Sequence, residues 1–256
     1  MSVQRKEPDM SVGAAVNPYI QQLGGGFMFS REGKEYAAET GVDTFFGPYT
    51  RGRGGVLGDV DAEVVTAAFG FFPAHSIRTA WESVQMPAAK AAERYARVCQ
   101  DFGRRKLAGF EQAGRLAELL EAVAAAADPA GVPLFAGWRA MPLPADAPAR
   151  VQQLTHVLRE LRGGLHLIAV RASGITPLQA VLISGSPIND GPGQARWYGW
   201  PEPFEEITDD IRARWQRAEA VTDELIAPAF AVLDEGEQAE LTELVAAAHA
   251  KVFARQ

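Results

Sequence analysis

The chain has 256 residues, of which 47% are hydrophobic and 22% charged, and its formal net charge is −7. This composition is typical of a globular protein and allows one large domain or two of modest size. The acidic balance disfavours a general nucleic-acid binder, because such proteins need a basic surface. The single cysteine, Cys99, excludes an internal disulfide and a cysteine-rich zinc site.

No run of residues approaches the length of a membrane span, and the polar N-terminus lacks the apolar segment of a signal peptide. We therefore expect a cytoplasmic protein without a membrane partner. The predicted organisation has four parts. These are a flexible arm (1–17), an N-terminal helical subdomain (18–130), a proline-rich connector (131–150) and a C-terminal helical subdomain (151–256).

Short helices are expected directly after the arm. Gly24–Gly26 end the first of them, and Ser30 is a typical N-cap for a second helix that runs to Thr40 and ends at Gly41. The following segment at 45–58, FFGPYTRGRGGVLG, is so rich in glycine that we expect a loop.

Longer helices follow, with breaks at prolines. Asp59 is expected to cap a helix that Pro73 ends or bends. Three further helices are predicted at Ala74–Met86, Pro87–Leu107 and Glu111–Ala127. Four prolines between 131 and 148 then indicate an extended connector.

The most informative segment is 151–170, VQQLTHVLRELRGGLHLIAV, which is predicted to be a helix. Its apolar side chains recur at helical spacing and form one stripe, at Leu154, Leu158, Leu161, Leu165 and Ile168. The opposite stripe is polar and contains Gln152, His156, Arg159, Gly163 and His166. Glycine inside a helix costs roughly 0.5–1 kcal/mol relative to alanine, so Gly163 and Gly164 indicate that another backbone or a ligand packs closely. We interpret this helix as the wall of a pocket.

Two more helices are expected near the C-terminus, with a short one before them. The short helix covers 176–184, with Pro177 in its first turn. An irregular connector rich in glycine and proline, at 184–203, precedes long helices at 204–230 and 235–254. Because the long helices offer a large apolar packing face, we expect a homodimer. No period-2 strand pattern is found, so the predicted fold is mostly α.

Several side chains are candidates for ligand binding. Arg159, Arg162 and His166 form a row on one helix face that could hold a carboxylate or phosphate, or could instead pair with nearby acids. His156 and His166 are candidate proton donors and acceptors, or else ordinary histidines with hydrogen-bonded neighbours. They are about 15 Å apart along a straight helix and cannot share one metal ion, so no metal site is predicted.

Outside this helix, Arg53 lies among glycines that could shape an anion-binding loop. Trp81 belongs to an aromatic group that is expected mainly in the core and is kept as a candidate ligand contact. No nucleotide-binding fingerprint, nucleophile elbow or zinc-protease motif is present, and no cofactor is predicted.

Six sequence motifs, in this order and spacing, resemble an actinobacterial family of helix-turn-helix or winged-helix proteins of unassigned function. They are GGGFMF (24–29), GRGGVLG (52–58), EVVTAAFGFFPA (63–74), PLFAGWRAMPLPADAP (133–148), LRELRGGLH (158–166) and TDELIAP (222–228). The resemblance implies a C-terminal half of degenerate winged-helix type.

The chain departs from the family pattern at two places. Leu161 stands where relatives tend to have a histidine, and of their usual histidines only His166 is kept. After Gly199-Trp200 about one helix and a wing are missing, and these are the parts that would enter a DNA groove.

Three functions therefore remain open. The first is a small-molecule-binding protein on a repurposed helix-turn-helix scaffold, with its pocket along 151–170. The second is a cofactor-independent enzyme in which His166 or His156 transfers protons and an arginine holds an anionic group. The third is a transcriptional regulator, although DNA is disfavoured as a partner by the acidic charge and the short wing.

Overall fold

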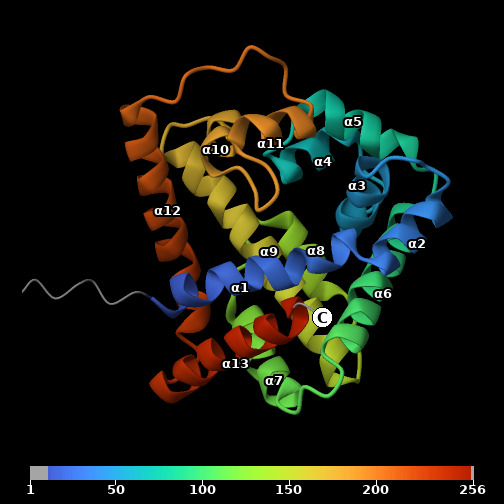
Figure 1. Ribbon diagram of the computed structural model, residues 1–256, viewed down its shortest axis with the longest axis vertical. Coiled ribbons are helices and arrows are strands. Elements are labelled where there is room, and N and C mark those ends of the chain that lie inside the picture. The colour runs from blue at the N-terminus through green and yellow to red at the C-terminus, as the bar shows by residue number, and fades with distance from the viewer. Residues whose placement is uncertain (1–10, 255–256) are drawn as a thin grey trace, which may run out of the picture.

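The computed structural model describes residues 11–254, and these residues form only helices and connecting loops (Figure 1). The prediction of a mostly α protein is confirmed. The α-helices are α1 (Val12–Gly26), α2 (Arg31–Thr40), α3 (Phe46–Gly54), α4 (Ala62–Phe69), α5 (Ala74–Ser83), α6 (Ala88–Lys106), α7 (Ala113–Ala126), α8 (Pro133–Ala140), α9 (Ala147–Ala172), α10 (Pro177–Ser184), α11 (Gly191–Tyr198), α12 (Asp209–Phe230) and α13 (Glu235–Phe253).

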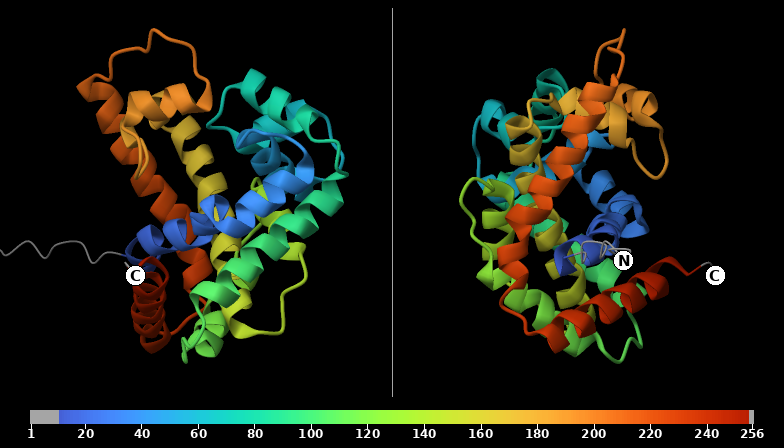
Figure 2. Two further views of the ribbon diagram at one scale, coloured as in Figure 1. Left: turned by 45° about the vertical axis from the view of Figure 1, so that its right-hand side comes forward. Right: turned by 90° about the vertical axis from the view of Figure 1, so that its left-hand side faces the viewer.

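The longest of these helices, α9, runs through the middle of the molecule (Figures 1 and 2). Asp146 caps its first turn by accepting a hydrogen bond from the Ala149 N–H at 3.3 Å. Helices α1, α6, α7, α8 and α12 all pack against it. Because neighbours surround its N-terminal half on every side, even polar residues of that half are buried.

One large hydrophobic core holds the molecule together. It contains residues from both predicted subdomains, for example Leu23 of α1, Leu120 of α7, Leu158 of α9 and Val245 of α13. The packing is therefore continuous across the predicted boundary at 131–150, and the subdomain division stays a prediction. Two small clusters lie apart from this core, one between α9, α10 and α12 and one between α10 and α11.

Helix ends with clear capping residues were predictable. Ser30 caps α2 by accepting from the Gly33 N–H at 3.2 Å, and Gly41 ends it in the left-handed conformation. Thr176 and Gln179 form a reciprocal capping box at the start of α10. The predicted caps at Ser30 and Gly41 are confirmed, as is Pro177 in the first turn of α10, whereas the capping box is seen only in the structure.

The expected loop at 45–58 is wrong, because Phe46–Gly54 is helix α3 and Gly55–Leu57 is one turn of 3-10 helix. The glycines serve close packing rather than a turn. A Cβ on Gly52 would lie 2.5 Å from the Tyr95 ring, and one on Gly55 would lie 2.3 Å from the Ala88 carbonyl oxygen. Here tertiary contacts outweigh low helix propensity.

Other segment predictions also need correction. Helix α1 begins at Val12, so residues 12–17 are not an arm, and residues 1–10 lie outside the described range. Each predicted connector contains a helix, α8 in the first and α11 in the second. The helix expected from 204 begins at Asp209, because Thr208 caps it and Pro203 precedes it.

No single helix within residues 11–254 is both long and apolar enough to cross a membrane. Helices α9 and α10 satisfy the length and composition criteria only when taken together, across a bend of 114°. Helix α9 is the central helix of the core.

Candidate functional site

The polar stripe predicted on α9 divides into two parts with different surroundings. In the N-terminal part, Gln152 donates to the Leu23 carbonyl oxygen at 2.7 Å, and the His156 Nδ1 lies 3.1 Å from the Gly24 carbonyl oxygen. Both side chains are fully buried and join α9 to α1. A Cβ on Gly24 would lie 2.5 Å from the Thr155 carbonyl oxygen, so the two helices touch at this glycine.

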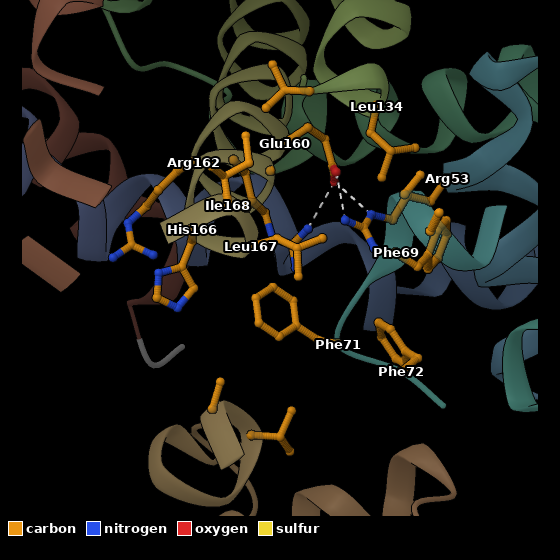
Figure 3. A pocket seen from close by; sticks show the side chains of 18 of the residues that line it. Arg53, Phe69, Phe71, Phe72, Leu134, Glu160, Arg162, His166, Leu167 and Ile168 are labelled. Carbon is orange, nitrogen blue, oxygen red and sulfur yellow. Dashed lines mark hydrogen bonds and ion pairs between the residues drawn. The ribbon is translucent and has the colours of Figure 1, made fainter. Parts of the chain in front are cut away.

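The C-terminal part of the stripe lines a cavity of about 460 Å³ (Figure 3). Residues from α3, α4, α9, α10, α11 and α12 contribute to its wall. Its apolar lining combines aromatic and aliphatic side chains and includes Phe69, Phe71, Phe72, Leu167, Tyr198 and Trp215. Its charged lining comes from Arg53, Arg159, Glu160 and Arg162. The volume lies within the range that small-molecule sites occupy.

A two-pronged ion pair between Arg53 and Glu160 lies at one end of this cavity (Figure 3). Arg53 Nε and Nη2 donate to the two Glu160 oxygens at 2.9 and 2.7 Å, and Nη1 donates to the Tyr49 hydroxyl at 3.0 Å. Burial raises the pKa of Glu160, but the Arg53 guanidinium outweighs that effect and the pKa is lowered to about 2. The pair is therefore fully charged near neutral pH.

Arg159 also donates to Glu160, at 3.1 Å, and its side chain is only partly exposed. Glu160 thus accepts from two guanidinium groups. This arrangement satisfies the buried carboxylate and leaves the arginines at this end of the cavity already paired.

The two glycines of α9 differ sharply in their surroundings. A Cβ on Gly164 would lie 2.5 Å from Val132 Cγ1, so close packing by a neighbour requires glycine there. A Cβ on Gly163 would meet no atom within 4 Å, and Gly163 lines the cavity. Packing therefore explains Gly164 and does not explain Gly163.

At the other end of the cavity, His166 and Arg162 line the wall and are hydrogen-bonded to two residues of α12 that lie outside the lining. His166 Nδ1 lies 2.9 Å from the Thr222 hydroxyl, and Arg162 Nη2 donates to Glu219 at 2.7 Å. Burial, assisted by the Arg162 charge, lowers the pKa of His166 to about 4. His166 is therefore neutral near pH 7, and its 3.6 Å approach to Glu219 is not an ion pair.

The structure brings together five of the predicted site residues around one cavity: Arg53, Arg159, Arg162, Gly163 and His166. It places the other three outside the lining. Gln152 and His156 lie between α9 and α1, and burial lowers the pKa of His156 to about 4. The indole N–H of Trp81 donates to the Val60 carbonyl oxygen at 3.1 Å, and the Arg51 guanidinium lies over its ring.

Several site residues were missed. Phe71 stacks on the His166 ring with centroids 5.7 Å apart, and Trp215 contacts the same ring edge-on at 5.1 Å. Thr222 and Glu219 belong to a helix more than 50 positions later in the chain. No local motif marks them, although Thr222 falls inside the family-like motif TDELIAP.

A second hollow of about 810 Å³ lies on the other side of α3 and is lined in part by Tyr36, Phe45, Tyr49 and Tyr95. Tyr49 lines both this hollow and the cavity beside α9. Within residues 11–254, no three His, Cys, Asp or Glu side chains come close enough to hold a metal ion.

Comparison with known families places this geometry in context. A family model described as the helix-turn-helix family matches residues 14–256, so the chain belongs to that family. The match confirms the predicted resemblance to a helix-turn-helix family, whereas the actinobacterial relationship and the shortened wing stay predictions. No curated protein and no solved structure matches the chain.

Proposed function

We propose that the protein binds a small, mostly apolar molecule in the cavity beside α9. The observation that carries this proposal is Gly163. Alanine would fit at this position without contacting any neighbour and would favour the helix by roughly 0.5–1 kcal/mol. A glycine that packing does not require, on the wall of a cavity, is accounted for if a ligand approaches the α9 backbone there.

The lining is consistent with such a ligand. Aromatic and aliphatic side chains together form the apolar wall, and the charged groups at both ends are largely paired with each other. An apolar wall with a few placed polar groups is typical of sites that bind small organic molecules.

A second candidate function is transcriptional regulation, which the family match favours. Helices α10 and α11 are joined by six residues at 185–190 and lie side by side (Figure 1), an arrangement similar to a helix-turn-helix unit but with a longer turn. Val181 of α10 and Tyr198 of α11 line the cavity. A bound ligand would therefore contact this pair of helices directly, so ligand binding and regulation would be coupled.

The charge distribution argues against this second function, because a regulator must bind DNA. Arg196, the one basic residue of α11, pairs with Glu202 at 3.0 Å, and the chain carries a net charge of −7. Phosphate contacts by several cations dominate the affinity of most DNA-binding proteins. The family match thus favours regulation, whereas the acidic charge and the paired Arg196 argue against tight binding of DNA by α11.

The ligand proposal is tested with N-phenyl-1-naphthylamine, a neutral fluorescent probe with an apolar ring system. We expect saturable binding with one site per chain, and loss of that site in Gly163→Leu, whose side chain enters the cavity. Gly114→Leu is the control, since Gly114 is exposed on α7 with no atom near its Cβ position. Equal probe binding by Gly163→Leu and wild type, both folded by circular dichroism, would contradict the proposal.

Regulation is tested by selecting genomic DNA fragments on the immobilised protein. A regulator would enrich a discrete set of sites, and Arg196→Ala would reduce that enrichment. Enrichment no greater than on an uncoated matrix would contradict regulation and leave ligand binding standing.

We also propose that the protein self-associates. Helix α12, the turn before α13 and the C-terminal end of α13 carry exposed apolar side chains, among them Leu225, Val232 and Phe253. Native mass spectrometry of freshly purified protein would report the subunit number and any retained small molecule together. A monomer at micromolar concentration would contradict this proposal.

A further inference from the structure

The hydrogen bonds around His166 determine which of its ring nitrogens carries the proton. The Thr222 hydroxyl donates to the Ala218 carbonyl oxygen at 2.7 Å. A hydroxyl has one proton and a carbonyl oxygen only accepts, so the Thr222 oxygen is an acceptor toward His166. His166 Nδ1, at 2.9 Å, must then be the donor, and in the neutral ring Nε2 carries a lone pair.

The bare Nε2 is an acceptor without a donor. Oε1 of Glu219 lies 3.6 Å from it and is also an acceptor. The other Glu219 oxygen is already bonded to Arg162. Phe71 and Trp215 pack against the imidazole, so the surroundings hold the ring in this orientation. His166 lines the cavity, so a ligand in the cavity that carries a donor group would satisfy its Nε2 acceptor.

A donor for the ligand is present at the same end. The Nε–H of Arg162 is buried and has no acceptor among the described residues. In Figure 3 the Arg162 and His166 side chains lie next to each other, on the opposite side of the cavity from Arg53. A ligand group that both donates and accepts would complement this end, and a hydroxyl is the simplest such group.

We infer that the ligand is a hydroxylated aromatic compound of the phenol class, whose hydroxyl donates to His166 Nε2 while its ring packs among Phe69, Phe71 and Phe72. This inference deepens the proposed ligand-binding function and rests on it. A carboxylate or phosphate is disfavoured, because an acceptor-only group would face the lone pair of Nε2 and the charge of Glu219. The arginines predicted to bind an anion are instead paired with Glu160 and Glu219.

The test compares three probes of similar shape by isothermal titration calorimetry: 4-ethylphenol, 4-ethylanisole and ethylbenzene. The anisole keeps the oxygen but has no proton to donate. We expect 4-ethylphenol to bind about tenfold or more tightly than either analogue, since only the phenol satisfies Nε2. In ¹⁵N spectra the Nε2 resonance of His166 should shift on addition of the phenol while Nδ1 remains protonated.

Two variants check the source of this preference. Thr222→Val removes the acceptor that fixes the tautomer, and Thr222 is not part of the cavity lining. We expect it to lower the phenol preference to a few-fold while ethylbenzene binds as in wild type. Thr222→Ser retains the hydroxyl and should retain the preference. Should Thr222→Val not fold, His166→Phe provides the same comparison, because it removes the acceptor and keeps an aromatic ring.

The outcomes separate this inference from the function on which it rests. Equal affinity for the phenol and the anisole in wild type, with both lost in Gly163→Leu, would overturn the phenol inference and leave the ligand cavity standing. Binding of none of the probes, including N-phenyl-1-naphthylamine, would overturn both.

Discussion

Arg53 of α3 and Glu160 of α9 are separated by 107 positions in the chain and form a two-pronged ion pair in the buried wall of the cavity. The pair joins the two helices on either side of the cavity at that end. Each partner is supported by further contacts, with the Tyr49 hydroxyl on Arg53 and the Arg159 guanidinium on Glu160. The pair thus fixes the position of α3 against α9.

Removal of one partner of this pair should destabilise the protein strongly. Because Arg53→Met leaves Glu160 as a buried charge with weaker pairing, we expect a loss of about 3–5 kcal/mol in the free energy of unfolding, measured by urea denaturation. The double variant Arg53→Met/Glu160→Leu should lose less than the sum of the single losses. Additive losses would show that the two side chains are not coupled. Arg78→Ala is the control, because it breaks an exposed pair with Glu63 and should leave the free energy of unfolding nearly unchanged.

Substitution by alanine should change the free energy of unfolding in opposite directions at the two glycines of α9. Gly163→Ala should raise the free energy of unfolding by roughly 0.5–1 kcal/mol, since its Cβ enters open space and the helix propensity improves. Gly164→Ala should lower it, because the Cβ would clash with Val132. Thermal denaturation of the two variants in parallel provides the measurement. The same sign for both would contradict the assigned environments.

The buried histidines make stability depend on pH. His156 and His166 each have a pKa lowered from 6.5 to about 4, chiefly by burial. Between about pH 4 and pH 6.5 the unfolded chain binds protons that the folded protein does not. The free energy of unfolding therefore has its full value above about pH 6.5 and decreases as the pH falls toward 4. At pH 5.5 we expect a loss of roughly 1 kcal/mol for each histidine, measured by urea denaturation against pH 7.5. His166→Phe should show a smaller loss, and an unchanged pH dependence in that variant would contradict the assignment.

The turn between α10 and α11 depends on Gly191. A Cβ there would lie 1.8 Å from the Leu182 carbonyl oxygen, so Gly191→Ala must push the two helices apart. We expect faster hydrogen exchange in α10 and α11 and weaker probe binding in the cavity that they line. Helix α13, which lies away from this turn in Figure 1, should keep its exchange rates. Uniform exchange changes would indicate general destabilisation instead.

Much of the helical fold was predictable because amphipathic spacing and capping residues are local signals. Ser30, Gly41 and Thr176 mark their helix ends correctly. Helix α3 was missed because its glycines resemble a loop signal, whereas they allow Tyr95 and the α6 backbone to approach. That reason lies in residues about 40 positions away, which no local window contains.

The candidate site was partly predictable for a similar reason. The spacing of residues on α9 placed Arg159, Arg162, Gly163 and His166 on one face, and these residues do line one cavity. The same spacing included His156, which lies against α1 instead. Periodicity identifies a face of a helix but not the neighbour that covers each part of it. Glu219, which completes the polar end, belongs to a distant helix.

The ring of Tyr49 forms part of the wall of both hollows, one on each side of α3. Its hydroxyl is bonded to Arg53, so the partition between the two spaces is held by the same guanidinium that binds Glu160. A shift of α3 would thus change the shape of both spaces at once. A molecule bound in one of them would change the shape of the other through the Tyr49 side chain.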